Sequence, residues 1–134
     1  MLRSVIVAAL LLSPTLGAAA KYGTYPRLEV NQLQDGRYEV IEAAGFGQEG
    51  VWCAAGEYAI RALGLNRGRI YVDRPSGPAL TRAGRKGIIF TTEVVAQQKS
   101  GSSSVRDRGS NLLIGHAVQF CADRSDRDDI WKSR

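Results

Sequence analysis

The chain has 134 residues, of which 44% are hydrophobic and 23% are charged, and its formal net charge is +5. This length is typical of one domain, and the composition excludes collagen-like, low-complexity and wholly disordered chains. No run of twenty apolar residues occurs, so we expect no stable membrane insertion through a helix.

The first twenty residues have the pattern of a secretory signal peptide. Arg3 precedes the apolar run Val5–Leu12, Pro14 breaks that run, and three small residues follow at Ala18–Ala20. This order is typical of a leader that is cleaved after a small residue. We therefore expect residues 1–20 to be removed and the protein to be exported to the periplasm or the extracellular space.

A β-hairpin and a helix are predicted in the first half of the remaining chain. Leu28–Gln34 and Arg37–Ala43 flank Asp35-Gly36, a dipeptide favoured in type I′ hairpin turns. Gly45-Phe46-Gly47 indicates a loop, and Val51–Leu63 follows a helical period.

Two glycines carry specific expectations for that helix. Gly64 stands where a glycine ends a helix. Gly56 lies inside the helix, where it costs about 1 kcal/mol relative to alanine. We expect it to allow a neighbouring element to approach closely.

The second half predicts further short strands and a second helix. We expect a strand at Arg69–Asp73 that ends at the turn Pro75–Pro78, and a strand at Ile88–Val95. After the loop Ser100–Ser104, Val105-Arg106 is expected to be an edge strand. Asn111–Cys121 is expected to form a helix with Ser110 as its N-cap, and 123–134 a charged tail.

These elements indicate one α+β domain at residues 21–122, with a small antiparallel sheet packed by one or two helices and one disulfide. Cys53 and Cys121 are the only cysteines. In an exported protein, an even number of cysteines is first interpreted as disulfides. A bridge closing this loop is worth about 4 kcal/mol in the chain-entropy model.

Positive charge is concentrated in the segment Arg61–Lys86, which has seven basic residues and one acidic residue. The seven are Arg61, Arg67, Arg69, Arg74, Arg82, Arg85 and Lys86. Such a segment could attract an anionic component of the cell envelope. Alternatively, it could be a solvated face whose positive charges are partly neutralised by the acidic first third of the chain. Nucleic acid is not expected as a partner, because Tyr71 is the only aromatic residue among these charges.

Cys53 has a second interpretation, as a nucleophile at a helix N-terminus. The stretches Gly50-Val51-Trp52-Cys53 and Gly115-His116-Ala117-Val118 resemble the cysteine helix and the histidine strand of transglutaminase-like thiol enzymes. That resemblance implies an acyl-transferase or peptidase with Cys53 as nucleophile, His116 as base and Asp123 as the residue that orients it.

The cysteines and their neighbours carry a broader resemblance. From Trp52-Cys53-Ala54 to Phe120-Cys121, the chain is similar to a family of small exported bacterial proteins of uncharacterised function. This similarity supports the cysteine pair as a structural bridge and implies no activity.

Cofactor and metal sites are not expected. His116 is the only histidine, and zinc needs three or four ligands. The run Gly45–Gly50 has G-x-G-x-x-G spacing, but it lacks the surrounding dinucleotide fold and is interpreted as a turn before the helix. The sequence thus favours a binding or accessory module, whose partner is an anionic envelope component or another protein. The thiol enzyme and a secreted enzyme inhibitor remain alternatives.

Overall fold

The computed structural model describes residues 20–22, 28–96 and 104–121. The elements are β1 (Ala20–Tyr22), β2 (Leu28–Gln32), β3 (Tyr38–Ile41), α1 (Gln48–Arg61), β4 (Arg69–Pro78), β5 (Lys86–Thr91) and β6 (Asn111–Leu113), followed by a short helix at residues 114–121. Across these ranges, six strands form one antiparallel sheet in the order β1-β2-β3-β5-β4-β6. The α+β class predicted from the sequence is confirmed.

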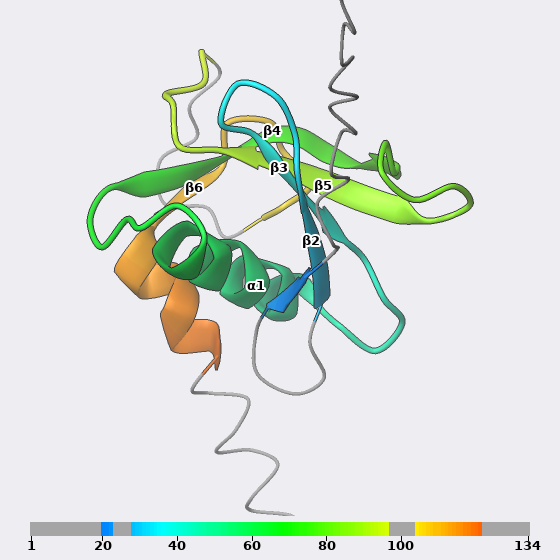
Figure 1. The fold of residues 1–134 in the computed structure, drawn as a ribbon, viewed down its shortest axis with the longest axis horizontal. Helices are drawn as coiled ribbons and strands as arrows, with labels where there is room; N and C mark the ends of the chain where they lie inside the picture. The colour runs from blue at the N-terminus through cyan, green and yellow to red at the C-terminus, as the bar shows by residue number, and fades with distance from the viewer. Residues whose placement is uncertain (1–19, 23–27, 97–103, 122–134) are drawn as a thin grey trace, which may run out of the picture.

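One face of the sheet carries the hydrophobic core. The two helices lie beside each other below that face (Figure 1). Strand alternation directs Tyr38, Val40 and Phe90 toward α1, where Trp52 is fully buried. The Trp52 and Phe90 rings meet edge to face, with centroids 5.2 Å apart. The opposite face also has buried positions, among them Glu39, Ile41 and Ile89.

The hairpin between β2 and β3 forms as predicted. Asp35 and Gly36 have φ values of 59° and 72°, the left-handed conformation that a type I′ turn requires at both central residues. The Leu33 N–H donates to the Arg37 carbonyl at 2.8 Å, and the Arg37 N–H donates to the Gln34 carbonyl at 3.3 Å. These bonds fix the register in which Val30 opposes Val40.

The two glycine predictions for α1 are also confirmed. Gly64 has a φ of 68°, the left-handed conformation that glycine favours just after a helix, and the Leu65 N–H donates back to the Ala59 carbonyl of α1 at 3.0 Å. A Cβ at Gly56 would lie 2.9 Å from the Ala117 Cβ, so glycine lets the two helices approach closely. The Cys53–Cys121 disulfide joins the same two helices, with a Cα–Cα distance of 5.1 Å.

The expected helix from Asn111 is wrong in its first turn. Residues 111–113 form β6, in which Ile70 of β4 opposes Leu112, and the helix starts at residue 114. Ser110 is therefore not an N-cap. Its carbonyl accepts a hydrogen bond from the Val72 N–H at 2.8 Å. A short apolar run fits either a strand or a helix, and pairing with β4 selects the strand.

The end of β4 also differs from the expectation. Pro75–Pro78 was predicted to end the strand, but β4 continues to Pro78 with register irregularities between Val72 and Gly77. Proline is compatible with a strand at such bulges, where no ladder hydrogen bond is needed from its nitrogen. The loop at residues 79–85 follows and is closed by the Ala79 N–H, which donates to the Arg85 carbonyl at 2.8 Å.

Two smaller expectations are wrong. β5 ends at Thr91 rather than Val95, because the Thr91 hydroxyl accepts the Glu93 N–H at 3.2 Å and turns the chain. Val105 and Arg106 lie in a turn rather than a strand. The Val105 N–H donates to Gln48 Oε1 at 2.9 Å, which attaches this turn to the start of α1.

Three predicted segments lie outside the described residues: the leader up to residue 19, the loop at residues 100–103, and the charged tail at residues 123–134. Ala20, the last residue of the predicted leader, is described and is the first residue of β1.

Candidate functional site

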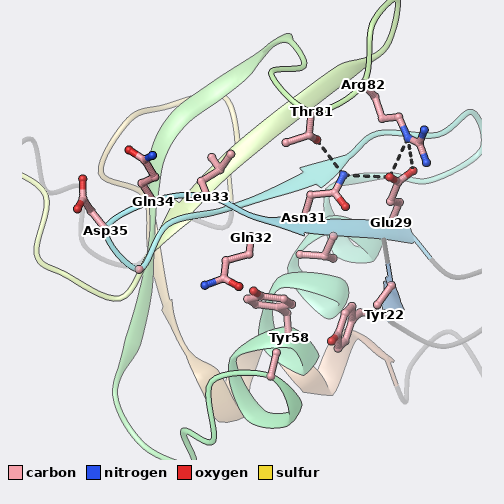
Figure 2. Close-up of a pocket in the computed structure, with 14 residues that line it drawn as sticks. Tyr22, Glu29, Asn31, Gln32, Leu33, Gln34, Asp35, Tyr58, Thr81 and Arg82 are labelled. Carbon is pink, nitrogen blue, oxygen red and sulfur yellow. Dashed lines mark hydrogen bonds and ion pairs between the residues drawn. The ribbon is translucent and has the colours of Figure 1, made fainter. Parts of the chain in front are cut away.

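A groove of about 980 Å³ runs along the outer edge of β2. Residues 30–36 line it without a gap. The rest of its lining comes from β1, α1 and the loop after β4, through Ala20, Tyr22, Glu29, Tyr58, Ala62, Thr81 and Arg82. Figure 2 shows Thr81 and Arg82 on one side of β2, and Tyr22 and Tyr58 on the other. The groove thus has a polar wall and an aromatic wall on either side of a strand edge.

The polar wall is a continuous chain of hydrogen bonds. Arg82 Nε donates to Glu29 Oε1 at 2.8 Å and to Oε2 at 3.1 Å. Asn31 Nδ2 donates to Glu29 Oε1 at 2.9 Å and to Thr81 Oγ1 at 2.8 Å. Since the Arg82 charge is answered by Glu29, this wall presents polar groups without a strong net charge.

Glu29 is held in its ionised form by these contacts. Partial burial raises the pKa of the Glu29 carboxyl. Hydrogen bonds from Asn31 and Arg82 and the positive charges of Arg82 and Arg85 together lower this pKa by more than burial raises it. The resulting pKa lies below the ordinary value of 4.5. The Glu29–Arg82 pair is therefore intact throughout the neutral pH range.

The aromatic wall is fixed by three tyrosines. The rings of Tyr22 and Tyr58 meet edge to face with centroids 5.1 Å apart, and those of Tyr58 and Tyr38 are 4.5 Å apart. The Tyr38 hydroxyl donates to the Ala55 carbonyl at 3.0 Å. Burial, with the nearby Tyr22 hydroxyl, raises the pKa of Tyr58, so this wall stays neutral.

The position of the polar wall depends on Glu39, whose side chain is fully buried on the sheet face opposite the helices. Its carboxylate accepts the Thr81 N–H at 2.9 Å, the Thr81 hydroxyl at 2.6 Å and the Leu80 N–H at 2.9 Å. Arg74 Nη2 lies 3.2 Å from Glu39 Oε2. Gly87 leaves room for this carboxylate, since a Cβ there would lie 2.9 Å from Glu39 Cγ. Glu39 thus anchors the loop that brings Thr81 and Arg82 to the groove.

The seven basic residues of segment 61–86 are not brought together as one unpaired group. Arg61, Arg67 and Arg69 are exposed near the start of β4, whereas the other four lie in the middle of β4, in the following loop and at the start of β5: Arg74, Arg82, Arg85 and Lys86. In this second group, Arg74 and Arg82 form ion pairs with Glu39 and Glu29. Arg85 Nη2 donates to the Glu42 carbonyl at 2.8 Å. Acidic side chains of the first third of the chain therefore neutralise Arg74 and Arg82 within this segment.

The residues of the thiol-enzyme interpretation are placed as follows. The sulfur of Cys53 is bonded to that of Cys121, and both residues are buried. His116 is exposed on the helix at residues 114–121, and Asp123 lies outside the described residues. A thiolate at Cys53 would require this disulfide to be reduced.

A smaller hollow of about 190 Å³ lies near Asp73. Arg37 Nη1 and Arg108 Nη2 each lie 3.3 Å from a carboxylate oxygen of Asp73. Asp35 and Glu93 also line the hollow, so its charges nearly balance. This cluster ties the β2–β3 hairpin to the turn before β6.

Sequence reasoning missed the groove and Glu39. Glu39 stands in a strand among other carboxylates without a distinguishing motif, and its partners are 35 to 42 residues away. In the described part of the chain, no group of three or more His, Cys, Asp or Glu side chains is arranged to hold a metal ion. Nor does any helix described here have the length and apolar character needed to cross a membrane. Comparisons with protein-family models, curated proteins and solved structures found no match.

Proposed function

We propose that this disulfide-stabilised α+β domain is an exported binding module and that its partner occupies the groove along β2. The observation that carries the proposal is the construction of the groove, which is about 980 Å³ in volume and has two differently composed walls held by fixed contacts. A few placed polar groups beside aromatic surface are typical of sites that bind a ligand by shape and hydrogen bonding.

The polar groups of the groove support binding better than catalysis. Glu29 is ionised and shared between Arg82 and Asn31, and Tyr58 is neutral. A general acid or base works best with a pKa near the operating pH, whereas these shifts move both groups away from neutrality. The walls therefore present stable donors and acceptors.

Export is supported by two features of the chain. The first twenty residues have the leader pattern, and Cys53 and Cys121 form a disulfide in the structure. Disulfides persist in oxidising compartments such as the periplasm and the extracellular space. Intact mass of the exported protein tests this part directly, since a chain beginning at Lys21 without free thiols is the expected result.

An anionic envelope component is the second candidate partner. It is supported by the exposure of Arg61, Arg67 and Arg69 at the end of α1 and the start of β4. None of these three arginines lines the groove, although Arg61 adjoins the lining residue Ala62, so residue-resolved binding data at Arg67 and Arg69 separate the two candidates.

The test is an NMR titration of the isotope-labelled exported protein with three probes. These are a tetrapeptide of alternating alanine and serine, a chitin trisaccharide and inorganic tripolyphosphate. We expect the amide signals of Gln32, Leu33 and Thr81 to shift with the peptide or the saccharide. Shifts confined to Arg61, Arg67 and Arg69 with tripolyphosphate would favour the second candidate, and no groove shift with any probe would contradict the proposal.

A further inference from the structure

We propose that the partner in the groove is an extended polypeptide segment, which pairs as an antiparallel strand with β2 at Asn31–Leu33. This inference rests on the proposed function and adds the class of partner and its register.

β1 covers only the first part of the edge. Its three residues pair with β2 through Ala20 opposite Val30, Lys21 opposite Glu29 and Tyr22 opposite Leu28. Among the described residues, the pairing stops at Val30, whereas β2 continues to Gln32 and the groove continues to residue 36. The groove is thus the continuation of the path that β1 follows along the sheet.

The backbone groups of β2 alternate in direction along this path. The Leu33 N–H donates to the Arg37 carbonyl at 2.8 Å and so faces β3. In an antiparallel ladder, neighbouring residues direct their N–H and C=O groups to opposite edges. The groups of Gln32 therefore face the groove, as do those of Val30. An incoming strand bonded to Gln32 would extend the ladder that β1 begins.

The composition of this edge also favours strand addition. Native sheets protect exposed edges with lysine, proline, bulges or covering segments. Residues 31–34 are Asn, Gln, Leu and Gln, so neither lysine nor proline occurs in this stretch. Arg82, the one positively charged side chain among the described residues that line the groove, is paired with Glu29 at 2.8 Å.

The walls define the side chains of the incoming segment. Successive residues of a strand point to opposite faces of the sheet. One set would face Tyr58 and Ala62, where small apolar side chains fit against the aromatic ring. The other set would face Asn31 and Thr81, where serine, threonine or asparagine can form hydrogen bonds. The segment we infer alternates small apolar and uncharged polar residues.

Removal of the leader would lengthen the available edge. Cleavage after Ala20, as the sequence predicts, takes away the residue that opposes Val30. The exported chain then has an open edge from Val30 to Leu33, about 13 Å long at 3.4 Å per residue. This length suits three or four residues of a partner.

The experiment uses the chain that begins at Lys21, with its disulfide intact, and a phage-displayed library of random twelve-residue peptides. A selected peptide is then synthesised with single N-methyl groups along its backbone. Methylation at every second residue should weaken binding about tenfold or more, because each such change removes a strand hydrogen bond and introduces a clash. Methylation at the intervening residues should change the dissociation constant less than about twofold, since their N–H groups point away from β2.

Two groove variants and one control variant give the matched comparison. Gln32→Pro removes the N–H that faces the groove and should abolish peptide binding. Tyr58→Leu keeps the groove's apolar character but should alter which side chains are selected. Arg67→Gln, at an exposed position that neither lines the groove nor adjoins a lining residue, should leave binding unchanged. Circular dichroism of each variant checks that it folds.

Several outcomes would overturn the inference. The first is a selection that yields no binding peptide. The second is a peptide whose binding is weakened equally by N-methylation at either alternating set of residues. The third is that only a second copy of this chain, through concentration-dependent self-association, binds the edge of β2. If a saccharide shifts the groove signals and no peptide does, the proposed function survives and the strand inference fails. If no probe reaches the groove, both fail.

Discussion

Thr81 donates two hydrogen bonds to the carboxylate of Glu39, from its N–H at 2.9 Å and from its hydroxyl at 2.6 Å, although the two residues are 42 positions apart. Thr81 also accepts the Asn31 side-chain amide at 2.8 Å. Glu39, a buried acid on the central strand β3, thus sets the position of the polar wall of the groove along β2.

Replacement of Glu39 by alanine should lower the free energy of unfolding by about 3 kcal/mol, because it removes the ion-pair partner of Arg74 and leaves the N–H groups of Leu80 and Thr81 without their acceptor. Urea unfolding measures this change. Glu42→Ala, at a less buried carboxylate that accepts the Ser76 hydroxyl, is the control and should cost less than about 1 kcal/mol. Equal losses in the two variants would contradict the role assigned to Glu39.

Gly87→Ala tests the space that Glu39 needs. The new Cβ would lie 2.9 Å from Glu39 Cγ and Cδ, so we expect a loss of about 1–3 kcal/mol. Gly77 is its partner across the β4–β5 pair, and there the nearest atom to a Cβ is 3.8 Å away. Thermal unfolding should therefore show Gly77→Ala to be much less harmful, and the reverse order would be incompatible with this packing.

Gly56 and Gly115 offer a matched pair in the two helices. Alanine is favoured over glycine inside a helix by about 1 kcal/mol. Gly115→Ala should gain a stabilisation of that order, because no atom lies within 4 Å of its Cβ position. Gly56→Ala should instead destabilise, since its Cβ would lie 2.9 Å from the Ala117 Cβ and 3.0 Å from Val118 Cγ1. Stabilisation by both substitutions would rule out close packing of the helices.

The Cys53–Cys121 disulfide should supply a large share of the domain's stability. Its cysteines are 68 positions apart, so loss of the bridge is expected to cost about 4 kcal/mol. Replacement of both cysteines by alanine, measured by urea unfolding, tests this value. The wild-type protein in a reducing agent should lose a similar amount, and identical unfolding with and without reductant would show that the bridge contributes nothing.

The Glu29–Arg82 pair predicts a pH dependence of stability. Because the folded pKa of Glu29 is depressed below 4.5, ionised Glu29 favours the folded state at pH values above 4.5. This advantage should decline as the pH falls through the folded pKa. The difference in unfolding free energy between wild type and Glu29→Gln should therefore be constant near neutrality and shrink in acid. A difference that grows in acid would have the wrong sign.

Local chemistry made part of this fold predictable. The Asp35-Gly36 turn and the left-handed Gly64 just after α1 each follow from the conformational properties of a few adjacent residues, and the cysteine pair follows from there being two cysteines in the chain. The strand at residues 111–113 was not predictable in this way, because its identity depends on pairing with β4, some 40 residues earlier.

The groove could not be predicted from the sequence for the same reason. Its walls come from Tyr22, Glu29, Tyr58 and Thr81, which no spacing rule connects. The basic segment looked like a binding surface in the sequence, but tertiary contacts pair Arg74 and Arg82 with acids from β2 and β3. Charge counting along a chain does not reveal such pairing.

The most direct test of the account is amide hydrogen exchange at Gln32 and Leu33 in the chain that begins at Lys21, measured with and without a selected peptide. Leu33 should be protected in both states, because its N–H is bonded to the Arg37 carbonyl. Gln32 should exchange freely alone and become protected when the peptide binds. Unchanged exchange at Gln32 in the presence of bound peptide would contradict strand addition at β2.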